Sequence, residues 1–299
     1  MQLIYALEPN AEINSKTDPV KTLKKQLNQS CDLFIYLLYF LTEVARYAET
    51  DAKKRATRNL PSSADLNVNT KIAGNSLLWT ILESPSFKQA VQQTSREFET
   101  TQEEIRNVYL AMAASDFYQQ YTKRQDRDKT AEKDIITFIF TDLMLADDNF
   151  TAHVEEHFTN WDDDAEMMNQ LMHNYLQKPT SFNLQEMIGE EKWKFAKELL
   201  TTSVEKKEFV MGLIKPKLKN WDAERIAQLD MILMRMGVCE FLYFETVPPK
   251  VTINEYIDVA KEYSTPQSGQ FVNGILDSIH KELVAQGKIH KIDFKQKTS

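Results

Sequence analysis

Residues that form turns are scarce in this sequence, and the scarcity limits the folds that it can adopt. The chain has 299 residues but only seven glycines and nine prolines, whereas short strands joined by tight turns need such residues at close intervals. The helix formers Leu, Ala, Glu, Lys, Gln and Met are abundant. With 42% apolar residues, the chain can bury a substantial core. We therefore predict an all-α protein.

Charge and glycine content divide the chain near residue 180. Residues 1–180 contain 19 Lys/Arg against 27 Asp/Glu, whereas residues 181–299 contain 17 of each and six of the seven glycines. The stretch QKPTSFN interrupts the helical pattern at this point. We predict an acidic N-terminal helical region at 1–180 and a compact domain of five helices at 181–299.

A long helix is predicted from Thr17 to Ala56. Its centre is the apolar run LFIYLLYFL, which has about half the length needed to cross a bilayer and therefore indicates a core helix rather than a membrane segment. The two cysteines, Cys31 and Cys239, are too few for a disulfide framework, and no secretory signal is visible. We expect a cytoplasmic protein that does not contact membranes.

The first residues, MQLIYALEPN, start inside a helical pattern. Leu3, Ile4 and Leu7 recur at the intervals of a helix face, and Pro9 marks the end of the helix. No N-cap residue precedes this helix. Either the helix begins abruptly, or sequence upstream of an internal methionine belongs to the native protein.

One short string has the pattern of a metal site. His153 and His157 in HVEEH fit H-x-x-E-H, in which two histidines one helical turn apart hold zinc and a glutamate activates water. The alternative is an acidic, solvent-facing helix that happens to carry two histidines, and we favour it because no third ligand can be named and both flanks, LADDN and TNWDDD, are acidic. Glycine-rich phosphate loops and G-x-S-x-G are absent from the sequence. We predict neither a metal cofactor nor an enzyme.

The most informative stretch is TVPPKVTINEYIDVAKEYSTPQSGQFVNGILDSI. Thr252 and Glu255 fit a capping box at the start of one helix. The polar residues from Ser264 to Gly269 then predict a turn that leads into a second helix. A helix start offers free N–H groups that suit a phosphate, and an exposed Phe271 beside it could stack on a base. The alternative for Phe271 is ordinary core packing.

Several separated strings resemble the NusB transcription antitermination family. They are GLIKPKLKNW, ERIAQLDMILMRMGVCEFL, VPPKVTINEYIDVAKEYS and SGQFVNGILD, which occur in the order and spacing of that family over roughly the last third of the chain. MQLIYAL is similar to the latter part of the family's first helix, so residues 1–8 are assigned to it. Residues 10–180 resemble the helical insertion of a long, Bacteroidetes-type form.

The resemblance implies a NusB-like helical bundle at the C-terminus and a transcription antitermination factor. Such a factor binds boxA-type RNA together with the small-subunit ribosomal protein NusE, within the RNA polymerase antitermination complex, and supports ribosomal RNA transcription. Carried over by position, the residues expected near RNA are Lys215, Lys217, Gln267, Ser268, Gln270 and Phe271. The residues expected to face the protein partner are Tyr5, Glu224 and Asp230.

The sequence departs from the family at its start. NusB proteins carry an arginine-rich segment directly before the helix that MQLIYAL resembles, and this chain has no such segment. We hypothesise that a basic arm precedes Met1 in the native protein, and that without it an acidic chain binds RNA weakly, with a shallow salt dependence. The competing interpretation is a protein-interaction scaffold without RNA binding, for which the acidic insertion is the docking surface.

Overall fold

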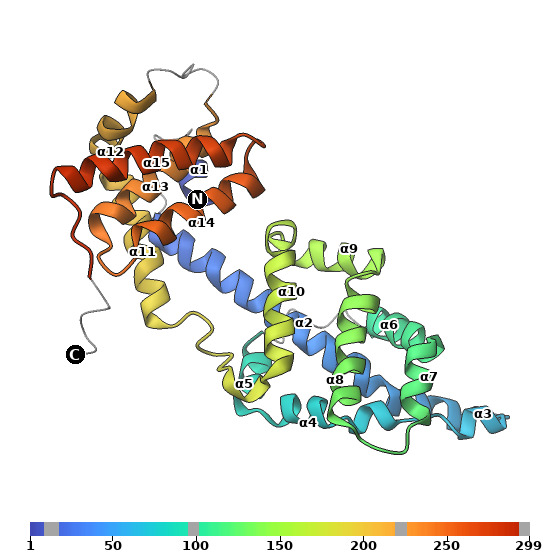
Figure 1. Ribbon diagram of the computed structural model, residues 1–299. Coiled ribbons are helices and arrows are strands. Elements are labelled where there is room, and N and C mark those ends of the chain that lie inside the picture. The colour runs from blue at the N-terminus through green and yellow to red at the C-terminus, as the bar shows by residue number, and fades with distance from the viewer. Residues whose placement is uncertain (9–17, 95–101, 219–225, 293–299) are drawn as a thin grey trace, which may run out of the picture. The chain divides into compact units, whose positions relative to one another are not determined.

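The computed structural model describes residues 1–8, 18–94, 102–218 and 226–292 (Figure 1). Regular structure in these ranges is entirely helical, which confirms the all-α prediction. The chain forms two compact units. We call residues Met1–Lys25 with Gly189–Ser299 the discontinuous unit, and residues Gln26–Ile188 the inserted unit. The predicted boundary near residue 180 stays a prediction.

The inserted unit is built around α2 (Pro19–Ala56). All residues of LFIYLLYFL except Tyr39 are buried, so the run is a core helix, as predicted. Aromatic rings fill much of the space around it; for example, the rings of Phe40 and Phe150 lie 4.5 Å apart. The surrounding elements are α3 (Ser63–Leu66), η2 (Lys71–Gly74), α4 (Ser76–Glu83), α5 (Pro85–Thr94), α6 (Gln102–Ala114), α7 (Asp116–Lys123), α8 (Lys129–Phe138), the π-helical η4 (Ile139–Met144), α9 (Asp148–His157), α10 (Trp161–Gln177) and η5 (Pro179–Ser181).

A buried carboxylate fixes the start of α4 against α8. Glu132 is 1% exposed, and its Oε2 accepts a hydrogen bond from the backbone N–H of Ser76 at 2.6 Å. Its Oε1 accepts from the Tyr121 hydroxyl at 2.8 Å. Asn75 donates to the Glu132 carbonyl at 2.7 Å and caps α4 with its own Oδ1. Since these buried groups satisfy one another, the first turns of the two helices are held at a fixed separation.

The discontinuous unit is built around α13 (Gln228–Tyr243), whose residues from Ile232 to Phe241 are buried almost without interruption. Gly237 permits close packing there, because a Cβ on it would lie 3.0 Å from Leu276. Leu3 and Ile4 belong to the same core cluster. The other helices are α1 (Gln2–Leu7), α11 (Glu190–Glu205), α12 (Lys207–Ile214), η6 (Lys215–Leu218), α14 (Pro249–Tyr263) and α15 (Ser268–Ala285), together with the first residues of α2.

The predicted capping box at Thr252 and Glu255 is wrong. Helix α14 begins three residues earlier, at Pro249, and Thr252 is a buried residue inside it. Proline is favoured at the first helical position because that position needs no N–H donor and the ring presets the backbone angle. The proline pair at 248–249 was therefore the stronger signal. Within the described ranges, no helix is both long and apolar enough to cross a membrane.

Candidate nucleic-acid and partner interface

The polar turn between α14 and α15 is an ordered structure held by one serine. The Oγ of Ser268 accepts a hydrogen bond from the backbone N–H of Thr265 at 3.2 Å and lies 2.8 Å from the Thr265 hydroxyl. The Ser264 hydroxyl lies 3.0 Å from the same oxygen. Ser268 is the first residue of α15 and is 2% exposed. A small side chain at this point therefore sets the course of the backbone through the turn.

The turn is attached to α13 through Asp230. Ser268 donates its hydroxyl hydrogen to Asp230 Oδ2 at 2.7 Å, across 38 positions of sequence. Asp230 lies in the first turn of α13 and is 4% exposed, and its Oδ1 has no hydrogen-bond partner among the described residues. The expectation that Asp230 faces a protein partner is at odds with this burial. The carboxylate instead positions the turn.

A hollow of about 460 Å³ opens beside this turn. It is lined by residues from α1, from the start of α13, and from the end of α14 with its turn. Tyr5, which is 47% exposed, lines the hollow together with Tyr263, Ser264 and Thr265, which are far from it in sequence. The structure therefore brings a residue predicted to bind protein close to the turn predicted to bind RNA. The full lining is Met1, Gln2, Tyr5, Ala227, Gln228, Leu229, Tyr263, Ser264 and Thr265.

The interpretation of Phe271 as an exposed stacking ring is wrong. Phe271 is only 7% exposed and belongs to the core of the discontinuous unit. In contrast to Phe271, the preceding residues Gln267 and Gln270 are exposed at the start of α15. A helix places residues three apart on neighbouring positions of one face. The two amide side chains are therefore exposed at this end of the helix, whereas the ring is not.

The two predicted lysines lie away from the turn. Lys217 Nζ forms an ion pair with Glu282 Oε2 at 2.6 Å, near the C-terminal end of α15. This contact lowers the pKa of Glu282. With a rise of about 1.5 Å per residue, Glu282 is about 21 Å along the helix from Ser268. Lys215 is exposed on the same short helix, η6. The structure therefore does not combine the lysines and the glutamines in one compact site, and Glu224 lies outside the described residues.

A partly buried ion-pair network that the sequence did not indicate holds α1 on α13. Glu8 Oε1 pairs with Arg235, whose side chain is 3% exposed, and with Lys207 Nζ at 3.1 Å. Gln228 donates to Glu8 Oε2 at 3.1 Å. Burial raises the pKa of Glu8, but the hydrogen bonds from Arg235, Gln228 and Lys207 outweigh it, so the pKa lies below its ordinary value. This network fixes the helix that carries Tyr5.

A second buried carboxylate joins α13 to α14. Glu240 accepts hydrogen bonds from the Tyr256 hydroxyl at 2.6 Å and from the Thr252 hydroxyl at 2.9 Å. Burial raises the pKa of Glu240 and also raises that of the Tyr256 phenol. Lys291 Nζ donates to the carbonyl oxygens of Glu240 and Phe244 at 2.8 and 2.6 Å, and so covers the end of α13. These contacts make the packing of α13 and α14 specific.

The H-x-x-E-H string lies on helix α9, but its two histidines contact other groups of the protein and are not arranged to hold a metal ion. His153 Nε2 is 2.8 Å from the Tyr36 hydroxyl inside the inserted unit, and His157 Nδ1 is 2.8 Å from the His153 carbonyl oxygen. Burial lowers the pKa of His153. Among the described residues, no group of three or more His, Cys, Asp or Glu side chains is arranged to hold a metal ion. The string therefore stabilises α9 on the core.

The discontinuous unit is thus an all-helical domain, whose polar turn is held by the buried carboxylate of Asp230 and whose neighbouring helix α1 is held by Glu8. Residues 158–281 match the model of the NusB family. This stretch, which is less than half of the chain, is therefore similar to the NusB family. The match runs from the last residues before α10 through most of α15.

Relatives of this chain include three proteins that bear the name transcription antitermination protein NusB. That of Salinibacter ruber is 44% identical over 97 residues, which are 32% of this chain and 61% of the relative. That of Chloroherpeton thalassium is 51% identical over 72 residues, 24% of this chain and 34% of the relative. That of Finegoldia magna is 42% identical over 87 residues, 29% of this chain and 64% of the relative. The chain thus spans about one third to two thirds of these relatives' lengths. No solved structure matches the chain.

Proposed function

We propose that this protein is a cytoplasmic transcription antitermination factor that binds boxA-type RNA together with the ribosomal protein NusE. The match to the NusB family model and the names of the relatives support the proposal. The structural observation that carries it is the turn anchored by Ser268 and Asp230, which presents exposed Gln267 and Gln270 next to the hollow that contains Tyr5. The protein acts by binding, as part of the RNA polymerase antitermination complex.

Amide side chains suit the recognition of single-stranded RNA. Such recognition relies on hydrogen bonds to the edges of unpaired bases, which Gln267 and Gln270 can both donate and accept. The discontinuous unit contains 21 Lys/Arg and 19 Asp/Glu, so it is nearly neutral. Few phosphate contacts mean few released counterions. We therefore expect affinity for RNA to depend only weakly on salt and to require a protein partner.

Tyr5 is the residue through which we expect the partner to join the RNA site. Its ring is half exposed on α1, and the network of Glu8 and Arg235 holds that helix against α13. Exposed tyrosines are frequent binding hot spots, because the ring offers a large apolar area and the hydroxyl a polar contact. A partner that covers Tyr5 would close one wall of the hollow beside the turn.

The test is filter binding of a boxA-type RNA to the full chain, with and without NusE. We expect RNA to be retained when the partner is present, and Gln267→Ala/Gln270→Ala to weaken retention about tenfold, as the loss of two polar contacts implies. Gln119→Ala/Gln120→Ala, at two exposed glutamines of the inserted unit, is the matched control and should change nothing. Absence of RNA binding in both conditions would favour the scaffold interpretation.

A further inference from the structure

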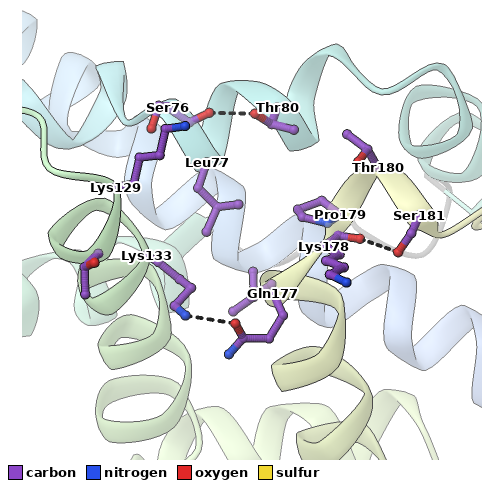
Figure 2. A pocket seen from close by; sticks show the side chains of 12 residues that line it. Ser76, Leu77, Thr80, Lys129, Lys133, Gln177, Lys178, Pro179, Thr180 and Ser181 are labelled. Atoms are coloured by element: carbon purple, nitrogen blue, oxygen red, sulfur yellow. Dashed lines mark hydrogen bonds between the residues drawn. The ribbon is translucent and has the colours of Figure 1, made fainter.

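The inserted unit contains a cationic hollow that its overall charge does not suggest. The unit carries 15 Lys/Arg against 25 Asp/Glu, a net charge of −10. Nevertheless, a hollow of about 580 Å³ between the first turns of α4 and α8 and the end of α10 is lined by three lysines, and no carboxylate belongs to its described lining (Figure 2). The lysines are Lys129, Lys133 and Lys178.

The three lysines come from two sides of the hollow. Lys129 and Lys133 are one helical turn apart on α8, so both side chains lie on one face of that helix. Figure 2 shows Lys129 reaching toward Ser76 of α4 and Lys133 reaching toward Gln177 at the end of α10, where its Nζ donates to Oε1 at 2.9 Å. Lys178 follows directly after Gln177. Three ammonium groups are thus presented around one space.

These charges are not neutralised by the protein's own acids. Within the described ranges, none of the three lysines forms an ion pair with a carboxylate, and Lys133 donates instead to the amide oxygen of Gln177. Glu132, which lies between two of them in sequence, is buried and is engaged by Ser76, Tyr121 and Arg127. Like charges at neighbouring positions of a helix are destabilising by about 0.2 to 0.5 kcal/mol per pair. An anion in the hollow would relieve this repulsion, and lysines bind phosphate as point charges.

We propose that this hollow binds a small phosphorylated molecule, with its phosphate between Lys129, Lys133 and Lys178. The volume falls within the range of small-molecule sites, and the exposed hydroxyls of Thr130 and Thr180 add donors to the lining. A polynucleotide fits less well, because its flanking phosphates would extend over a strongly acidic unit. A small ligand is surrounded by the lysines at short range, where salt screens their attraction little.

The experiment is isothermal titration of the full chain with inorganic pyrophosphate. We expect saturable binding at one site, and a loss of affinity of at least about tenfold in Lys129→Gln/Lys178→Gln, since each charge-assisted hydrogen bond to phosphate is worth about that factor. The control Lys88→Gln/Lys123→Gln changes the net charge by the same amount at exposed lysines of the same unit outside the hollow, and should alter affinity less than about twofold. Unchanged urea unfolding midpoints confirm that all variants are folded.

Three results would overturn the proposal. Pyrophosphate that fails to saturate the wild-type chain shows that the hollow is not a phosphate site. Equal loss of affinity in the two double variants shows a general effect of net charge. A short single-stranded RNA that binds more tightly than pyrophosphate, and loses affinity in Lys129→Gln/Lys178→Gln, shows that the ligand is a polynucleotide and not a small molecule.

Discussion

Replacing Ser268 with Ala tests whether one hydroxyl holds the proposed RNA-binding turn. The substitution removes the donor to Asp230 and the acceptor for the Thr265 N–H. A hydrogen bond to a charged group contributes about 1.5 to 3 kcal/mol, and a neutral one about 0.5 to 1.5 kcal/mol. The variant also leaves the carboxylate of Asp230 buried without that partner. We expect the free energy of unfolding to fall by about 2 to 4 kcal/mol.

The assay is urea unfolding followed by far-ultraviolet circular dichroism, with a double-mutant cycle. In an Asp230→Ala background, which has no acceptor for the Ser268 hydroxyl, the cost of Ser268→Ala should fall to about 1 kcal/mol, because only the contacts with Thr265 and Ser264 are then lost. Ser278→Ala is the control. Ser278 is half-buried on the same helix and has no side-chain hydrogen bond to the described residues. The same variants should be measured for RNA retention, where a disturbed turn predicts weaker binding.

Two outcomes would refute this reasoning. One is a cost of Ser268→Ala no greater than that of Ser278→Ala, which would mean that the hydroxyl contributes nothing specific. The other is a cost that is equal in the wild-type and Asp230→Ala backgrounds, which would mean that the two side chains are not coupled.

Three further predictions concern buried ionisable groups. Arg235→Met removes the partner of Glu8 and should lower the free energy of unfolding by about 2 to 4 kcal/mol at pH 7, measured by urea unfolding. Because the pKa of Glu8 is lowered, this advantage of the wild type should vanish as the pH falls below about 4.5 and through the lowered pKa. A cost that persists in acid would contradict the prediction. Glu240 has the opposite sign: its pKa is raised, so its contribution to stability is present in acid and is lost as the pH rises through the raised pKa. Glu240→Gln should flatten that part of the pH profile of the unfolding midpoint, and an unchanged slope would refute the assignment. Because the pKa of His153 is lowered, the stability of the wild type is complete with respect to this residue above about pH 6.5 and is progressively lost in acid. His153→Gln should remove this loss of stability in acid, whereas His157→Gln, at an exposed position, should not.

The helices could be predicted because apolar periodicity is a local property of the sequence. The long helix was placed at Thr17–Ala56 and is observed at Pro19–Ala56. The acidic run of Asp162, Asp163 and Asp164 lies in the first turn of α10, where the helix dipole favours negative charge. The start of α14 was missed because two start signals competed, and the proline pair prevailed over Thr252.

The candidate site could be predicted only in part, since its geometry depends on contacts between distant residues. The polar turn was found from composition, but its anchor joins Ser268 to Asp230 across the sequence. Asp230 was assigned to the protein partner by its position in the family pattern, which does not indicate whether the side chain is buried. The ring of Phe271 points inward because α15 packs on α13 and α14, and this packing cannot be predicted from the neighbouring sequence. The hollow of three lysines was likewise hidden, because Lys178 is far in sequence from the other two.

The discontinuous unit imposes an order on folding. Leu3 and Ile4 belong to the core of the discontinuous unit. The other members of this core lie either in the segment Met1–Lys25 or after Gly189. The first helix must therefore wait while the intervening 163 residues, Gln26–Ile188, are made, which takes about 8 to 30 s at ordinary rates of synthesis. Closing an unstructured loop of that length costs about 4.5 kcal/mol in chain entropy. A continuous segment with a core of its own can fold during the delay, so the ribosome reaches the last helices with the long loop already compacted.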